Sequence, residues 1–136
     1  MKYTELKQKH QKELADFKGI IYAFSDKQLE SGLKSLGLTI ADKYSLEPLG
    51  FGGFILKTKK ADYAAMIRSH KIEMDSLFEN PESLLEALVY ELENHEYCIT
   101  IDDSDALCAL GLDLTDIRVQ AVLPRARKIA MEGVQA

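Results

Sequence analysis

The sequence predicts an α+β fold in which about five to six helices pack on a small sheet of three to four short strands. Stretches with apolar residues every three or four positions alternate with short runs of strand-forming residues. Two helix starts are marked, by a capping-box spacing at Ser25 and Gln28 and by Asn80 followed by Pro81. Because 136 residues lie within the usual size of one domain and no linker-like segment divides them, residues 1–136 are predicted to form a single domain.

The first part of the chain is predicted to fold as helix, strand and helix. The first helix is expected to end near Gly19, and its apolar stripe contains Tyr3, Leu6, His10, Leu14 and Phe17. Residues 20–24 are continuously apolar and rich in strand formers, which predicts a buried, central strand. Ser25 is expected to cap a second helix, which Gly37 ends.

The middle of the chain is predicted to be extended and then helical. Residues 44–46 and 51–56 are candidate strands, connected by a hairpin or a bulged turn among the glycines at 50, 52 and 53. Thr58 is expected to cap a long third helix that reaches Phe78. A fourth helix follows Pro81, has a leucine-rich core face and ends near residues 94 and 95.

The last part of the chain is predicted to contain a strand and two further helices. Residues 97–101 are expected to form the strand. Three aspartates at 102, 103 and 105 suit the N-terminus of a helix that ends at Gly111. Thr115 is a candidate cap for the final helical region, in which Pro124 predicts a kink or a restart.

Charge is distributed unevenly along the chain, although the net charge is only −5. Residues 71–105 hold eleven acidic residues and one base, whereas residues 1–70 hold twelve bases and eight acids. Such a run of charge is typical of solvated helix faces. The alternative is an acidic face for a basic partner, made by Glu82, Glu86 and Glu93.

Several features that the sequence lacks bear on its cellular location and on its class of partner. No apolar run is long enough to span a membrane, and the N-terminus does not resemble a signal peptide. The cysteines, Cys98 and Cys108, suit two reduced thiols, so a cytoplasmic location is expected. A pI near 5.2 and the absence of a binding motif disfavour nucleic acid, even with lysines at 57, 59 and 60.

The three histidines all fall within or beside apolar helix stripes. His10, His70 and His95 could converge on a transition metal, with Cys98 as a further ligand. None of them forms an i, i+4 pair with another histidine, and no His-Glu-x-x-His motif is present. Partly buried histidines that are hydrogen-bonded to backbone or carboxylates are the favoured interpretation, with a pH-sensitive or partner-facing role as another.

Other chemical motifs each lack a required part. The glycines at 50–53 precede a strand and are not followed by Gly-Lys-Ser/Thr, so a turn is favoured over a nucleotide cradle. The aspartates at 102, 103 and 105 lack the glycine and glutamate of a calcium loop. A Cys-His nucleophile pair remains an alternative. No catalytic residue, metal ligand or cofactor is therefore assigned.

Polar residues at the ends of predicted elements supply one candidate binding site. Its members are Ser25, Gln28, Asn94, His95 and Glu96. A pocket near Ser25 and residues 94–96 would suit a small-molecule or metal-binding domain or a small enzyme. This is the alternative to a protein-binding role.

Five short segments carry a family resemblance that spans residues 17–112. They are residues 22–28 with Gly32 and Leu33, the turn at 50–54, residues 90–97, residues 105–107 and residues 109–111. With these segments the chain resembles a family of small uncharacterised proteins from phages, prophages and mobile elements of bacteria. The resemblance implies an accessory role in a mobile element and no known activity.

The leading hypothesis is a non-enzymatic protein that binds a host or phage protein. It is motivated by the missing catalytic motif, the uneven charge and the family resemblance. The sequence does not predict the partner's identity or an oligomeric state.

Overall fold

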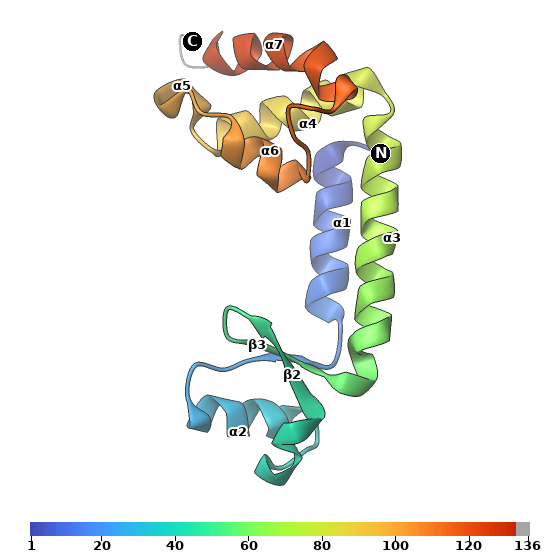
Figure 1. Cartoon of the computed structure of the whole chain (residues 1–136), viewed down its shortest axis with the longest axis vertical. Helices are drawn as coiled ribbons and strands as arrows, with labels where there is room; N and C mark the ends of the chain where they lie inside the picture. The colour runs from blue at the N-terminus through green and yellow to red at the C-terminus, as the bar shows by residue number, and fades with distance from the viewer. Residues whose placement is uncertain (133–136) are drawn as a thin grey trace. The chain divides into compact units, whose positions relative to one another are not determined.

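The computed structural model describes residues 1–132, which fall into two compact units (Figure 1). We call residues 1–9 together with 71–132 the helical unit, and residues 10–70 the sheet unit. The division falls within α1 (Tyr3–Asp16) and within α3 (Lys60–Phe78), so each of these helices has residues in both units. A single domain over residues 1–136 stays a prediction.

The helical unit is organised around α4 (Pro81–Asn94). This helix packs against α7 (Ile117–Glu132), α6 (Ser104–Leu110) and α5 (Tyr97–Thr100), and Figure 1 shows α6 and α7 alongside it. The apolar stripe of α4 is enclosed in a core that also holds Phe78, Val119 and Ala126. The leucines of α4 that the sequence assigned to the core are therefore buried against α6 and α7.

Cap residues set the start of α4 as the sequence predicts. Asn80 Oδ1 accepts hydrogen bonds from the backbone N–H groups of Glu82 (2.9 Å) and Ser83 (3.3 Å), and Pro81 occupies the first turn. Gly111, with φ 67°, ends α6 in the left-handed conformation.

The final helix differs from the prediction at its start. Asp116 Oδ1 accepts a hydrogen bond from the backbone N–H of Arg118 (2.8 Å), so Asp116 and not Thr115 caps α7. Thr115 donates its hydroxyl hydrogen bond to Asp113 instead. The helix continues through Pro124 without a restart.

The sheet unit contains an antiparallel sheet of order β1-β3-β2, with one face packed on α2 (Asp26–Ser35). Its strands are β1 (Ile20–Tyr22), β2 (Leu46–Gly50) and β3 (Gly53–Leu56). Ile21 pairs with Phe54 and Leu46 with Leu56, and these side chains share the face that packs on Leu33 of α2. Strand alternation places Ile20, Tyr22 and Ile55 on the opposite face.

The predicted central, buried strand is wrong in both respects. β3 pairs with both neighbours, which leaves β1 at an edge. Of residues 20–24, Ile21 and Ala23 are buried, whereas Tyr22 is 68% exposed and Phe24 79% exposed. A continuous apolar run indicates that both faces of a strand can be covered, but it does not show that they are.

Other predicted strands shift or disappear. Residues 40–45 form a 3₁₀ helix, η1 (Ile40–Ser45), so the strand expected at 44–46 begins only at Leu46. Phe51 and Gly52 form the turn before β3. A second 3₁₀ helix, η2 (Lys57–Lys59), occupies the position where Thr58 was expected to cap α3.

The strand expected at 97–101 is the short helix α5. Only Tyr97 in this segment is buried, and Glu96 and Ile101 flank the helix with φ values of 57° and 55°. Local β propensity is weak without a neighbouring strand to pair with.

The α+β class is confirmed. Residues 1–132 contain seven α-helices, two 3₁₀ helices and three strands, which is more helices than the five to six expected. The extra elements are short segments that carry no apolar periodicity. None of the helices in residues 1–132 is long and apolar enough to cross a membrane.

Candidate functional site

The predicted binding residues Ser25 and Gln28 belong to the sheet unit and form the start of α2. Ser25 Oγ accepts a hydrogen bond from the backbone N–H of Gln28 (3.2 Å). Gln28 Oε1 accepts one from the backbone N–H of Phe24 (2.7 Å). Ser25 is thus the predicted N-cap, whereas Gln28 accepts from the amide of Phe24 and not from that of Ser25, as a capping box requires.

The predicted binding residues Asn94, His95 and Glu96 belong to the helical unit and form the end of α4. Asn94 is its last residue, His95 follows as the C-cap, and Glu96 lies in the left-handed conformation before α5. A shared pocket with Ser25 stays a prediction.

The predicted acidic face lies on α4. Glu82, Glu86 and Glu93 are all exposed, and Glu82 forms an ion pair with Arg125 (3.1 Å). The helical unit holds fifteen acidic and eight basic residues, whereas the sheet unit holds seven acidic and nine basic ones. The acidic charge is therefore a property of one unit.

The histidines occupy two different environments. His10 and His70 stack within the sheet unit, with ring centroids 3.9 Å apart and planes 15° apart, and Glu13 lies 3.0 Å from His70 Nε2. His95 lies in the helical unit beside Glu91. Across residues 1–132, no three His, Cys, Asp or Glu side chains are gathered as metal ligands. Cys98 and Cys108 are free thiols.

The helical unit contains a buried carboxylate that sequence reasoning missed. Glu91 of α4 is fully buried, and its Oε1 accepts hydrogen bonds from Tyr3 Oη (2.7 Å) and Lys7 Nζ (2.7 Å). Its Oε2 lies 3.3 Å from His95 Nε2. The Lys7 ammonium also lies 5.3 Å from the ring centroid of Tyr90. We call Tyr3, Lys7, Glu91 and His95 the Glu91 cluster.

Ionisation within the Glu91 cluster is set by competing effects. Burial raises the pKa of the Glu91 carboxyl, but hydrogen bonds from Lys7 and Tyr3 and the positive charge of Lys7 outweigh it, so the pKa lies below its ordinary value. Burial and the adjacent carboxylate raise the pKa of the Tyr3 hydroxyl well above its ordinary value. Glu91 is thus an anion and Tyr3 a neutral donor at neutral pH.

The Glu91 cluster ties the first turns of α1 to α4. Tyr3 and Lys7 both donate to the same Glu91 oxygen, and Glu91 has no exposed surface from which to act on a substrate. This is the arrangement of a structural ion pair. A signal was available in the sequence, because Glu91 is three residues after Leu88 and seven after Leu84, on the apolar stripe of α4.

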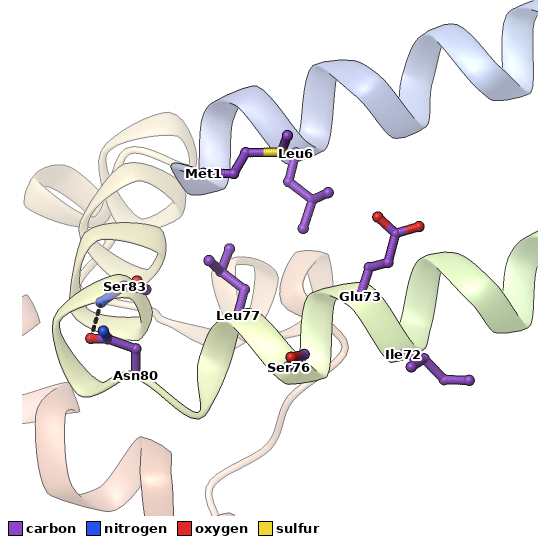
Figure 2. A pocket seen from close by; sticks show the side chains of 8 residues that line it. All are labelled: Met1, Leu6, Ile72, Glu73, Ser76, Leu77, Asn80 and Ser83. Atoms are coloured by element: carbon purple, nitrogen blue, oxygen red, sulfur yellow. Dashed lines mark hydrogen bonds between the residues drawn. The ribbon is translucent and has the colours of Figure 1, made fainter.

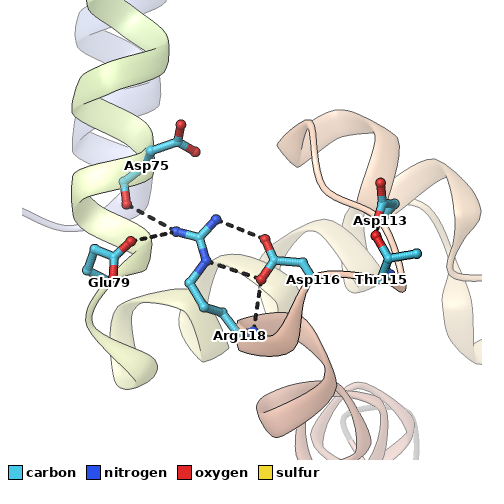
Figure 3. Close-up of polar contacts among 6 residues, drawn as sticks. All are labelled: Asp75, Glu79, Asp113, Thr115, Asp116 and Arg118. Carbon is cyan, nitrogen blue, oxygen red and sulfur yellow. Dashed lines mark hydrogen bonds and ion pairs between the residues drawn. The ribbon is translucent and has the colours of Figure 1, made fainter.

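A second polar network holds the start of α7 (Figure 3). The Arg118 guanidinium donates to Glu79 Oε1 (3.0 Å), to the carbonyl oxygen of Asp75 (3.4 Å) and to Asp116 Oδ2 (2.9 Å). The hydrogen bond from Arg118 lowers the pKa of Asp116. These contacts join the end of α3 to α7.

The helical unit also has a shallow groove of about 620 Å³ between the first turn of α1 and the end of α3. Figure 2 shows Leu6 and Leu77 pointing toward one another at its base, whereas Ile72 points away. Asn80, at its edge, is already engaged as the cap of α4. The groove therefore lies between two helices and has apolar side chains from both of them at its base.

The sheet unit exposes four large apolar side chains around the turn between β2 and β3. Tyr22 is 68%, Phe24 79%, Leu49 40% and Phe51 99% exposed. We call these four residues the hairpin surface. Their proximity follows from the glycines beneath them.

Gly52 and Gly53 make room for the hairpin surface. A Cβ on Gly52 would lie 2.5 Å from the Phe24 ring, and a Cβ on Gly53 would lie 3.2 Å from the Tyr22 ring and 3.6 Å from Leu49. The two rings therefore lie over the hairpin backbone. The glycines thus form part of a turn, as predicted, and their lack of a side chain also lets the Phe24 and Tyr22 rings pack against the backbone.

Phe51 occupies the tip of this hairpin in an unfavourable conformation. Its φ is 51°, in the left-handed region that bulky residues rarely adopt. Its ring contributes nothing to the core that would compensate for this conformation, since the residue is 99% exposed. Glycine or asparagine is the usual choice at such a position.

Comparison with models of protein families shows which family the chain belongs to. A family model matches residues 2–132. The chain belongs to DUF7659, a family of unknown function. Neither the curated proteins nor the solved structures contain a match to it. Family membership therefore assigns no activity, and the functional argument depends on the geometry above.

Proposed function

We propose that this DUF7659 protein is a non-enzymatic binding protein and that its hairpin surface contacts a partner protein. The observation that carries the proposal is Phe51, a fully exposed aromatic residue held in a left-handed conformation. A neighbouring group of Tyr22, Phe24 and Leu49 extends the apolar area. Exposed apolar groups of this kind mark interaction sites, and aromatic residues dominate the energy of many interfaces.

The partner in this proposal is a host or phage protein, met in the cytoplasm. Support for a mobile-element setting comes from the sequence resemblance alone. Support for protein as the class of partner comes from the uncharged composition of the hairpin surface, which offers no cations for nucleic-acid phosphates.

Site-specific photo-crosslinking in the source cells tests the proposal. Benzoylphenylalanine in place of Phe51 is expected to crosslink one discrete protein. The matched control is the same amino acid in place of Tyr44, an aromatic residue that is 77% exposed but lies outside the hairpin surface. Equal crosslinking at both positions, or none at Phe51, would contradict the proposal.

A second contact region is proposed on the acidic face of α4. It is supported by the excess of acidic residues in the helical unit and by the exposure of Glu82, Glu86 and Glu93. Replacing Glu86 and Glu93 with lysine is expected to weaken binding of the crosslinked partner at low salt. Unchanged binding would restrict the interface to the sheet unit.

A further inference from the structure

The β1 edge of the sheet has backbone groups that face outward. Leu56 N–H donates to the carbonyl of Gly19 (2.8 Å), and Ala23 N–H donates to that of Gly52 (2.8 Å). Because hydrogen-bonding direction alternates along an antiparallel strand, the backbone N–H and C=O groups of Ile21 point toward β3. Those of Ile20 and Tyr22 point away from it. Within residues 1–132, neither residue hydrogen-bonds across this outer side.

The opposite edge of the sheet, on β2, is protected. The backbone groups of Glu47 point toward Ile55 of β3, so the backbone of the next residue, Pro48, points to the outer side. Proline has no N–H there to bond to an added strand. A register shift between Pro48 and Gly50 interrupts the strand further. β1 has neither feature, and residues 20–24 include no charged side chain that would block strand addition.

Open space lies beside β1 on both faces of the sheet. A groove of about 770 Å³ runs between β1 and α2, where it is lined by Lys27, Gln28, Ser31 and Ser35. A smaller hollow of about 270 Å³ lies by Ile20 and Tyr22 and is lined by Leu14, Phe17 and Tyr63. A strand added beside β1 would direct alternate side chains into these two spaces.

We propose that β1 is a docking site for an extended segment of the partner protein, which adds as a fourth strand to the sheet. This inference rests on the proposed function and specifies its binding mode. Main-chain hydrogen bonds from Ile20 and Tyr22 supply affinity, and the two spaces supply specificity. The hairpin surface continues the same site through Tyr22 and Phe24.

The chemistry of the two spaces defines the segment. The residue opposite Ile21 enters the groove beside α2, where Lys27 and two serines favour an acidic or small polar side chain. The residues opposite Ile20 and Tyr22 meet Leu14, Phe17 and Tyr63, which favour apolar or aromatic side chains. The preferred pattern is apolar, acidic or polar, apolar.

A second copy of this chain would be a poorer occupant. Residues 20–24 are apolar at every position, so a second β1 strand would place Ile21 beside Lys27 and the serines of α2. A partner strand with a polar residue at that position complements the groove better.

A displayed library of random twelve-residue peptides, selected on the full chain, tests the inference. Selected peptides are expected to share the alternating pattern. A synthetic copy of the best one is then scanned by N-methylation, one amide at a time. Amides that bond to β1 should lose about tenfold in affinity at every second position, and the intervening amides should lose little.

The matched protein variants are Tyr22→Pro and Tyr22→Val. Tyr22→Pro removes an outward N–H and gives β1 the feature that Pro48 gives β2, whereas Tyr22→Val removes only the ring. Affinity should be about tenfold lower for Tyr22→Pro than for Tyr22→Val. If Tyr22→Pro fails to fold, the N-methyl scan still decides, because it alters only the peptide.

Several results would overturn strand addition. These are a library that enriches no peptide, a scan without alternation, and a bound peptide that is helical. A dimer in sedimentation experiments that Tyr22→Pro dissociates would assign β1 to a second copy. Crosslinking at Phe51 combined with a scan lacking alternation would leave the proposed function standing and remove only this binding mode.

Discussion

In the helical unit a charged carboxylate, Glu91, is fully buried, whereas in the sheet unit the aromatic ring of Phe51 is 99% exposed. Both are reversals of the usual preference for charge outside and large apolar groups inside. Glu91 is compensated within its own unit by hydrogen bonds from Tyr3 and Lys7. Phe51 has no such compensation in its own unit. We therefore ascribe a role in stability to Glu91 and a role in binding to Phe51.

The largest effect is expected from Glu91→Ala. This change leaves the Lys7 ammonium and the Tyr3 hydroxyl without their carboxylate, and breaking such a pair costs about 3 kcal/mol of unfolding free energy. Urea denaturation measures it. The control, Glu86→Ala, alters an exposed glutamate on the same helix and should change stability by less than about 0.5 kcal/mol.

Acid should weaken the same contact. Because the pKa of Glu91 is lowered in the folded protein, the unfolded state binds more protons as the pH falls below the ordinary value of 4.5. The stabilisation is therefore complete above that pH and is lost as the pH falls through the folded-state pKa. Thermal melts between pH 7 and pH 3 should show a shallower decline for Glu91→Leu than for the natural chain. Equal slopes would contradict the lowered pKa.

Packing of β1 on α2 in the sheet unit is expected to be the next most sensitive feature. A Cβ on Gly32 would lie 2.8 Å from Ile21 Cδ1 and 3.1 Å from its Cβ. Gly32→Ala should destabilise the sheet unit by about 1 to 2 kcal/mol, since overpacking exceeds the gain in helix propensity. Ser31→Ala, one residue earlier and exposed, is the control and should be neutral or slightly stabilising in the same denaturation experiment.

A smaller effect is expected at the start of α7. Arg118→Ala removes four side-chain hydrogen bonds to three residues at a partly exposed site, with an expected cost of about 1 kcal/mol. Arg125→Ala removes one ion pair between side chains that are 63% and 74% exposed, and should cost almost nothing. Similar losses in the two variants would show that the Arg118 network does not hold α7.

The sequence was informative where a local signal decides the structure. Ser25 and Asn80 are helix caps because their side chains bond to amides two or three residues later, and that spacing is visible in the sequence. The leucine stripe of α4 is likewise a local periodicity. Each was predicted at the right residue.

Prediction failed where distant segments decide the structure. The edge position of β1 depends on β3, which pairs with it from more than thirty residues away. Burial of Glu91 depends on Tyr3 and Lys7, which are 88 and 84 residues distant. No local pattern distinguishes an apolar strand that is covered from one that is exposed, so the hairpin surface was also missed.

The most direct test of the account is Phe51→Gly, measured for both stability and binding. Glycine relieves the left-handed strain, so unfolding free energy should be unchanged or rise by up to about 1 kcal/mol. Affinity for the partner crosslinked at the hairpin surface should fall at least about tenfold. A destabilised protein that binds its partner as tightly as before would contradict the account, because Phe51 would then serve the fold and not the interface.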